Sequence, residues 1–177
     1  SKIMTKKAFE NAIVVASAIG ASSNCPPHLS AIAKNMGIKI NLNEWQKLGH
    51  DIPLLVNCKP AGEHLMEKFY RSGGVPAVMQ ELLKRKKLHK SVKTASGKTL
   101  EQNLKIKINV NTDVVKSFDD PVVDNAGFIV MKSNFFNSAV MKTSVISEEF
   151  RERYLSNPDH PNVFEGKAVM FEGPEDY

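Results

Sequence analysis

Apolar residues recur every three or four positions through the first half of the chain, which is the spacing of amphipathic helices. The first predicted helix covers residues 3–20, with Thr5 as its N-cap and Gly20 as its left-handed end. Its apolar stripe consists of Phe9, Ala12, Ile13 and Ala16. A second helix is predicted from the prolines at 26–27 to Gly37, because proline fits a first helical turn. Its buried stripe is Leu29, Ile32, Ala33 and Met36.

Shorter elements follow. Asn43 is the predicted cap of a short helix that contains Trp45 and Leu48, and residues 52–57 have the pattern of a buried strand. After a turn at 59–62, another helical stripe consists of Leu65, Met66, Phe69 and Tyr70. The glycines at 73–74 break this helix. Pro76 then opens a helix whose predicted buried side is Val78, Met79, Leu82 and Leu83.

The pattern changes from about Thr94 onward. A short helix near Leu100 is followed by three β-favouring runs, at residues 127–132, 138–145 and 167–172. We therefore predict a mixed α/β fold with a domain boundary near residues 91–97. The expected domains are a helical part over 1–93 and a β-rich part over 94–177.

The composition is that of a globular protein, with 42% hydrophobic residues in 177. No apolar run approaches the roughly 18 to 20 residues that span a bilayer, and the start of the chain does not resemble a secretion signal. Cys25 and Cys58 are too few for a disulfide framework. We therefore expect a soluble protein of a reducing compartment, cytoplasmic or alternatively mitochondrial.

The net charge of +5 is unevenly distributed. Residues 148–177 carry three Lys/Arg and eight Asp/Glu, which leaves +10 on residues 1–147. A basic body of this kind can attract nucleic acid, membrane surfaces or anionic metabolites. Its densest run, KRKK at 84–87, lies where a helix is predicted to end and where cations complement the helix dipole. No aromatic residues interleave with the run, so we expect neither nucleic acid nor a membrane as partner.

Residues 20–28 (GASSNCPPH) gather small, hydroxyl, amide, thiol and imidazole groups at the start of the second predicted helix. A helix N-terminus offers unpaired N–H groups and the positive end of the dipole. A carboxylate or phosphate held by Ser22, Ser23 and Asn24 is well placed there. The same three side chains are good helix caps, which stabilise a helix by about 1 kcal/mol without binding a ligand.

The same residues are compatible with other chemistry. Cys25 and His28 can form a Cys₂His₂ zinc site with Cys58 and His64, although the spacing is not that of a familiar finger. Cys58 is otherwise a small buried hydrophobe. His28 either faces the same cavity as the serines or donates to a backbone carbonyl. An acyl-transfer nucleophile elbow is disfavoured, because its second glycine is missing and a strand does not precede the turn.

Residues 20–24 resemble the Gly-Gly-Ser-Thr-Asn motif of the dihydroxy-acid dehydratase and phosphogluconate dehydratase family. The extension SNCPPHL at 23–29 is most similar to the family's pentonate branch, which acts on sugar acids such as L-arabinonate or D-xylonate. Ala21 replaces the motif's second glycine and Ser23 its threonine. Further similar segments follow in the family's order: PLLVNCKPAG at 53–62, RSGGVPAVMQEL at 71–82, SGKTLEQNL at 96–104, NFFNSAVMKTSV at 134–145 and FEGPEDY at 171–177.

The resemblance implies a hydro-lyase that converts a 2,3-dihydroxy acid into a 2-keto-3-deoxy acid. It also implies an iron-sulfur cluster and Mg²⁺ beside a small sugar acid in a full-length homo-oligomer, with Ser22, Ser23 and Asn24 lining the cavity. An iron-sulfur cluster suits this reaction, because the 3-hydroxyl of the substrate is a poor leaving group and an electrophilic iron can act as the Lewis acid that it needs. Lys142 aligns with a family lysine and is a candidate substrate contact; its alternative is a strand residue that faces solvent.

Several family motifs do not occur in this chain. The cluster cysteines and most Mg²⁺ ligands lie upstream of the glycine-rich motif in the family, and the proposed base, a serine in Thr-Asp-Gly-Arg-x-Ser-Gly, lies downstream of residue 177. We therefore expect no catalytic residue or metal ligand here, with Cys25 only a distant candidate near the cluster.

From these absences we expect the chain to be a middle portion of a longer dehydratase, inactive alone. It is expected to join the end of the helical cluster-binding N-terminal domain to the start of a β-rich C-terminal domain. The alternatives are a dihydroxy-acid dehydratase of branched-chain amino-acid synthesis and a noncatalytic basic binding protein.

Overall fold

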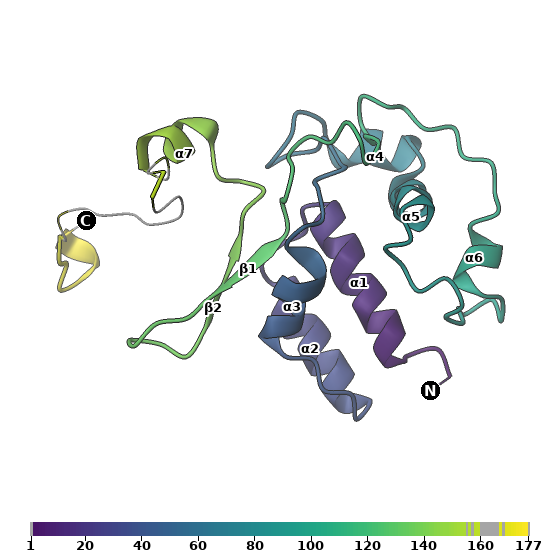
Figure 1. Cartoon of the computed structure of the whole chain (residues 1–177), viewed down its shortest axis with the longest axis horizontal. Helices are drawn as coiled ribbons and strands as arrows, with labels where there is room; N and C mark the ends of the chain where they lie inside the picture. Colours follow the sequence, from purple (N-terminus) through teal and green to yellow (C-terminus); the bar gives the residue numbers. More distant parts are fainter. Residues whose placement is uncertain (1, 155, 157, 160–166, 168, 177) are drawn as a thin grey trace. The chain divides into compact units, whose positions relative to one another are not determined.

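The computed structural model describes residues 2–154, 156, 158–159, 167 and 169–176 (Figure 1). Its backbone forms two compact units, residues 1–145 and 146–177. Within the described residues there are seven α-helices and one two-stranded sheet, so the mixed α/β prediction is confirmed at that level. The domain boundary at residues 91–97 refers to a longer dehydratase and stays a prediction.

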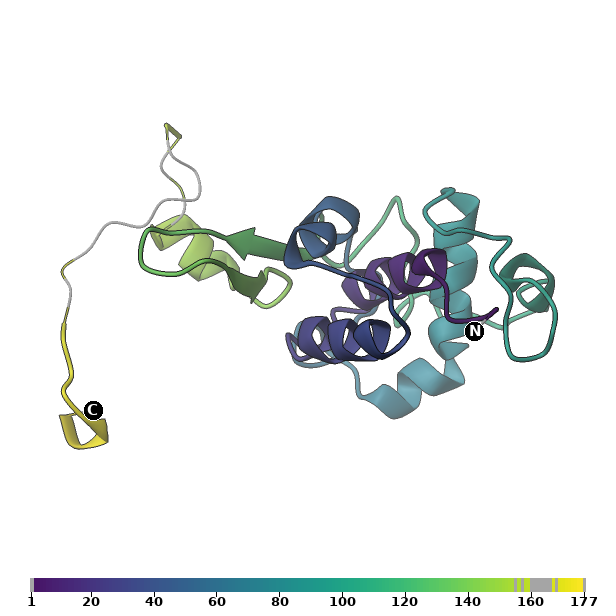
Figure 2. The same ribbon diagram turned by 90° about the horizontal axis from the view of Figure 1, so that it is seen from below.

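Helix α1 (Lys6–Ala18) is the centre of the first unit. The Thr5 hydroxyl accepts a hydrogen bond from the backbone N–H of Ala8 (3.3 Å), which confirms the predicted N-cap. Helices α2 and α3 contact one side of α1 and α5 contacts the other (Figures 1 and 2). Both sides of α1 are therefore apolar: Phe9, Ile13 and Ala16 belong to one core cluster, and Val14, Val15 and Ala18 belong to the other.

Helix α2 (Cys25–Asn35) begins one residue before the prolines, close to the prediction. Its predicted buried stripe is largely wrong. Ala33 is buried, but Leu29 is only half-buried, and Ile32 and Met36 are exposed. The helix touches α1 through a narrow strip, and its remaining surface faces outward.

Helix α3 (Leu42–Gly49) is capped by Asn41, two residues before the predicted cap, because a capping box forms there. The Asn41 side chain accepts from the Glu44 N–H (3.1 Å), and the Glu44 carboxylate accepts from the Asn41 N–H (3.0 Å). Trp45 of this helix is completely buried, and its ring meets Phe128 edge to face at 5.1 Å. This aromatic pair joins α3 to the sheet.

The buried segment 52–57 is extended, but it does not form a strand of a regular sheet. Leu54 and Val56 make isolated antiparallel bridges with Val123 and Val115. The Leu55 N–H donates instead to the carbonyl of Ala18 at the end of α1 (2.8 Å). The backbone of residues 52–57 is thus hydrogen-bonded to several separate segments and not to one neighbouring strand. The predicted burial of this segment is confirmed, but the prediction that it forms a strand is wrong.

Helix α4 (Met66–Arg71) and helix α5 (Gly74–Lys84) are separated at Gly73, which has φ +92°. The predicted stripe of α4 is wrong, because only Phe69 is buried while Leu65, Met66 and Tyr70 are exposed. Helix α5 begins two residues before Pro76. Its buried residues are Gly74, Ala77, Val78 and Leu82, with Met79 and Leu83 half-buried.

Helix α6 (Leu100–Asn103) confirms the short helix predicted near Leu100. Strands β1 (Phe128–Met131) and β2 (Ala139–Lys142) pair antiparallel, with Phe128 opposite Lys142, and confirm the first two β-favouring runs. The third run shows no strand at residues 167 and 169–172, and residue 168 lies outside the described residues. The second unit contains α7 (Glu148–Tyr154), which was not predicted, and the 3₁₀ turn η1 (Pro174–Asp176).

Candidate functional site

The turn between α1 and α2 has the shape that the sequence predicts at Gly20. This residue has φ +62°, and its N–H donates to the carbonyl of Ser17 (3.1 Å). The chain then passes through Ser22, Ser23 and Asn24, whose side chains are exposed. The Asn24 side chain makes no capping hydrogen bond. The three residues assigned to substrate binding are therefore accessible to solvent.

The backbone at the start of α2 offers less to an anion than the sequence suggests. The Asn24 N–H donates to the Ser22 hydroxyl (3.2 Å), and the Cys25 N–H donates to the Ser22 carbonyl (2.9 Å). Pro26 and Pro27 have no N–H. No free amide is therefore available from residues 24–27, and the contribution of this helix end is limited to its dipole and side chains.

Lys142 brings a positive charge to this turn from the end of β2, which is 122 residues away in sequence. Its Nζ donates to the carbonyl of Gly20 at 2.5 Å. Burial lowers the pKa of Lys142 below the usual 10.5, and the neighbouring Cys25 opposes that shift. An ammonium has three N–H donors, so two remain after this contact. The structure thus places the predicted lysine against the predicted loop.

Cys25 lies close enough to Lys142 for their charges to interact. Burial raises the pKa of the Cys25 thiol above 9.0, and the Lys142 ammonium acts in the opposite direction. The raised pKa disfavours the thiolate of Cys25 in the chain as it stands, so the thiol is not activated as a nucleophile.

Ser144 is a residue of this site that the sequence reasoning missed. It is 5% exposed, and its hydroxyl has no hydrogen-bond partner among the described residues. The hydroxyl oxygen lies 3.5 Å from the point where a Cβ on Gly20 would be. Ser144 lies in the turn that follows the end of β2 at Lys142, so the alternation of a strand does not reach it. Its position beside Gly20 is a tertiary feature without a signal in the local sequence.

His28 lies one turn into α2 with an exposed side chain. Its imidazole makes no hydrogen bond to the described residues, so the backbone-carbonyl alternative is not supported. The zinc alternative is not supported either. Cys25 packs against one core cluster and Cys58 belongs to the other. Across the described part of the chain, no group of three His, Cys, Asp or Glu side chains could hold a metal ion.

The basic run at the end of α5 is largely engaged with neighbouring groups. Lys84 pairs with Glu81 (2.8 Å), and Arg85 pairs with Asp119. Arg85 and Lys87 also lie over the ring of Phe118, at 5.6 and 5.9 Å from its centre. Two of the four charges in the run are therefore paired with carboxylates, as on an ordinary solvated surface. None of the helices in the described residues is long and apolar enough to cross a membrane.

Comparison with known proteins identifies the class. Residues 1–103, more than half of the chain, match the family described as dihydroxy-acid/6-phosphogluconate dehydratase N-terminal. The chain therefore belongs to this family of dehydratases, which confirms the resemblance found at residues 20–29.

Several curated relatives are similar over nearly the whole chain. The D-xylonate dehydratase of Caulobacter vibrioides is 47% identical over 99% of this chain and 29% of that protein. The L-arabinonate dehydratase of Rhizobium leguminosarum bv. trifolii is 39% identical over 100% of this chain and 29% of that protein. The dihydroxy-acid dehydratase of Acetivibrio thermocellus is 39% identical over 97% of this chain and 30% of that protein. The chain thus spans about 30% of the length of these relatives.

Proposed function

We propose that this chain is the part of a sugar-acid dehydratase that forms one wall of the substrate site. The whole enzyme removes water from a pentonate to give a 2-keto-3-deoxy acid. The proposal is supported by family membership and by the relatives named above, of which the D-xylonate dehydratase is 47% identical and the dihydroxy-acid dehydratase 39%. The higher identity with the D-xylonate dehydratase supports a sugar acid, although the L-arabinonate and dihydroxy-acid dehydratases are equally similar at 39%. A branched-chain dihydroxy acid is therefore the second candidate substrate.

The contact between Lys142 and Gly20 carries the assignment of the site. It joins two segments that resemble the family, residues 20–29 and 134–145, across 122 positions of sequence. The two remaining Nζ donors and the α2 dipole place positive charge beside the exposed Ser22, Ser23 and Asn24. In the proposal, Lys142 binds the substrate carboxylate, and the loop side chains hold the sugar hydroxyls. His28 supplies a further polar contact.

The cofactors that the family resemblance implies do not fit the donors of this chain. Cys25 packs against one core cluster and Cys58 belongs to the other, so the two thiols do not converge on one site, and no group of three His, Cys, Asp or Glu side chains among the described residues could hold a metal ion. The residues described here therefore bind and orient the substrate, while the iron-sulfur cluster, Mg²⁺ and the base belong to other parts of the enzyme. The 177-residue chain alone is accordingly inactive.

A segment exchange tests this function. The segment of the Caulobacter D-xylonate dehydratase that aligns with this chain is replaced by the chain itself, and the chimera is purified with its cofactors. Dehydration is measured with D-xylonate, L-arabinonate and a branched-chain 2,3-dihydroxy acid. We expect turnover of a pentonate by the chimera and none by the isolated chain. Preference for the branched-chain acid would instead support the second candidate.

The noncatalytic alternative makes a different prediction. A basic binding protein would hold a short DNA or RNA with an affinity that falls steeply with salt. Because Lys84 and Arg85 of the densest basic run are paired with Glu81 and Asp119, we expect no such steep dependence.

A further inference from the structure

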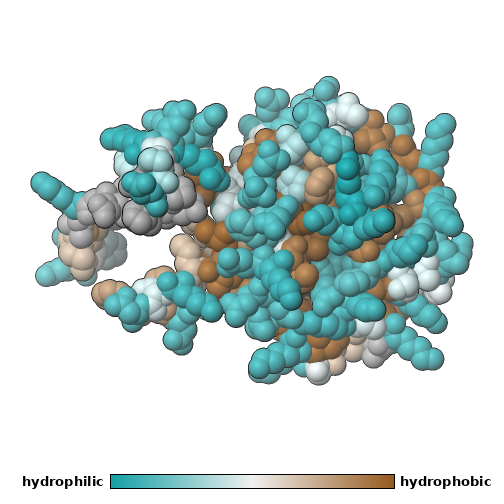
Figure 3. All heavy atoms as spheres, in the orientation of Figure 1, coloured by the Kyte–Doolittle hydropathy of each residue, from teal (hydrophilic) through white to brown (hydrophobic). Residues whose placement is uncertain are grey.

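Ser144 carries a buried hydroxyl without a partner, which is much rarer on a protein than an exposed apolar side chain. Figure 3 shows apolar surface (brown) in several places among the polar side chains of one view, which is the ordinary case. Ser144 is only 5% exposed, and its hydroxyl makes no hydrogen bond to the described residues. A hydroxyl that folding removes from water without a partner destabilises the folded chain. The stability of the chain therefore does not explain a serine at this position.

The end of β2 and the turn after it bring two donors to Gly20. Lys142 Nζ donates to the Gly20 carbonyl (2.5 Å), and Ser144 Oγ lies 3.5 Å from the point where a Cβ on Gly20 would be. Thr143, between the two, is fixed to a different segment. Its hydroxyl and its N–H both donate to the carbonyl of Gly127, at 2.7 and 3.3 Å. These bonds of Thr143 hold its two neighbours against the turn before α2.

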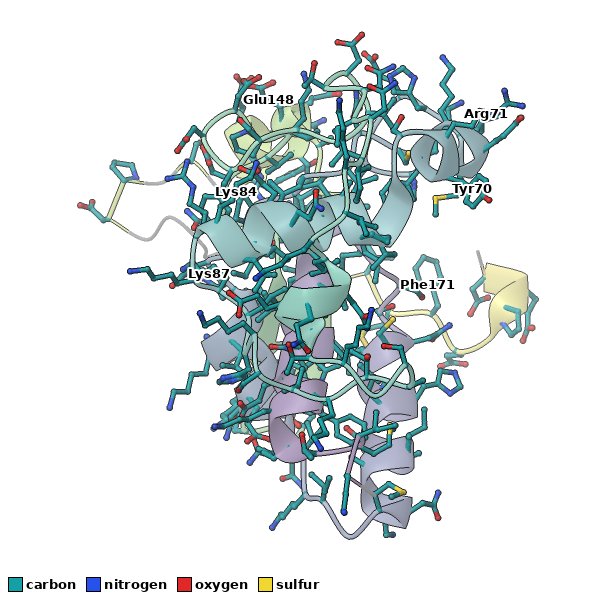
Figure 4. All side chains as sticks on the ribbon, turned by 90° about the vertical axis from the view of Figure 1, so that its right-hand side faces the viewer. Tyr70, Arg71, Lys84, Lys87, Glu148 and Phe171 are labelled. Carbon is teal, nitrogen blue, oxygen red and sulfur yellow. The ribbon has the colours of Figure 1, made fainter. Side chains whose placement is uncertain are left out.

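Lys142 differs from the exposed lysines of the chain because it has a partner inside the fold. Lys84 and Lys87 are exposed, and Figure 4 shows both on the outside of the molecule near the end of α5. Lys142 is half-buried and bonded to the Gly20 carbonyl. A substrate carboxylate competes with that neutral carbonyl for the ammonium, and the charge-assisted bond is the stronger of the two. Binding therefore draws Lys142 away from Gly20, whose carbonyl loses this donor.

We propose that Ser144 is a positioning residue for Lys142. When Lys142 shifts to the substrate carboxylate, the Ser144 hydroxyl turns and donates to the Gly20 carbonyl in its place. The inference rests on the proposed function. A serine hydroxyl has one O–H donor, which rotates to suit its surroundings. Because the carbonyl is then paired both before and after binding, the shift of Lys142 costs less, and Ser144 acts without touching the substrate.

The D-xylonate dehydratase chimera tests the inference through KM and kcat for D-xylonate. Ser144→Ala removes one neutral hydrogen bond from the bound state, so we expect KM to rise about three- to tenfold while kcat changes by less than about twofold. Ser91→Ala, at an exposed serine between α5 and α6, is the matched control and should change neither constant. An unchanged KM in the folded Ser144→Ala chimera would overturn the inference.

The same substitution in a Lys142→Met chimera separates positioning from direct contact. Because Ser144 acts through Lys142, Ser144→Ala should change KM by less than about twofold once Lys142 is methionine. An equal rise in KM with and without Lys142 would show that Ser144 contacts the substrate itself, which would overturn the positioning role. If Lys142→Met alone leaves KM unchanged, the proposed function and the inference both fail. If Lys142→Met raises KM and Ser144→Ala does not, only the inference fails.

The isolated chain gives a second test that does not depend on the chimera. The Ser144 hydroxyl has no partner while Lys142 occupies the Gly20 carbonyl, so Ser144→Ala should not lower the urea midpoint followed by Trp45 fluorescence. Lys142→Met frees the carbonyl for Ser144. In that background Ser144→Ala should lower the midpoint by about 0.3 to 1 M urea. A midpoint that falls equally in both backgrounds, or in neither, would contradict the exchange of donors.

Discussion

Replacing Gly20 by alanine tests how tightly the turn before α2 is packed. At φ +62° a residue with a side chain is strained by about 1 to 2 kcal/mol. The new Cβ would also lie 2.8 Å from Leu54 Cδ1, inside normal contact distance. Leu54 is buried, so the neighbouring core has to shift, and such overpacking costs about 1 to 3 kcal/mol. We expect a total loss of about 2 to 5 kcal/mol.

Gly37 provides a matched control for the strain alone. It has φ +70°, but no atom lies within 4 Å of its would-be Cβ. Gly37→Ala should therefore cost only about 1 to 2 kcal/mol, from the backbone. Unfolding in urea is followed by the fluorescence of Trp45, the one tryptophan of the chain. Equal losses for Gly20→Ala and Gly37→Ala would refute the packing of Leu54 and Ser144 on this turn.

Three further predictions concern the first unit. Asn11→Ala should lower the free energy of unfolding by about 2 kcal/mol, because the buried Asn11 amide accepts from the N–H of His89 (2.7 Å) and donates to its carbonyl (3.1 Å). Urea unfolding measures the loss, and a change below about 0.5 kcal/mol would contradict the prediction. Phe128→Ala should cost about 3 to 5 kcal/mol and shift Trp45 emission to longer wavelength, and unchanged emission would count against the edge-to-face contact. Cys25→Ala should reduce the loss of folding free energy that occurs above pH 9.0. In the wild type the pKa of the Cys25 thiol is higher in the folded chain than in the unfolded chain. The unfolded chain therefore loses the thiol proton first and is favoured as the pH rises. An equally steep alkaline loss in wild type and variant would show that Cys25 is not its source.

Local chemistry in the sequence predicts helix ends better than it predicts burial. Thr5, Gly20 and Gly73 act at the positions where caps and breaks are expected, because those effects involve only neighbouring residues. The stripes of α2 and α4 were predicted to be buried and are largely exposed. Periodicity shows that a helix has an apolar side, but it does not show what covers that side.

The site shows the same division between local and tertiary information. The composition of residues 20–28 indicates the loop, and the family resemblance indicates Lys142. The hydrogen bond between Lys142 and Gly20 and the position of Ser144 are tertiary features that one sequence does not contain. The loss of free amides at 24–27 follows from two prolines and from the Ser22 bonds, and only the first of these is visible in the sequence.

The central claim is that this chain supplies the wall of a sugar-acid site, with Lys142 as the carboxylate contact. The most direct test is the KM for D-xylonate of the chimera with Lys142→Met. Because the carboxylate is bound in both the ground state and the transition state, we expect KM to rise about 10- to 100-fold with a smaller change in kcat, equivalent to one charge-assisted hydrogen bond. Lys132→Met, at an exposed lysine between the strands, should leave KM unchanged. An unchanged KM in a folded, cofactor-loaded Lys142→Met chimera would contradict the account.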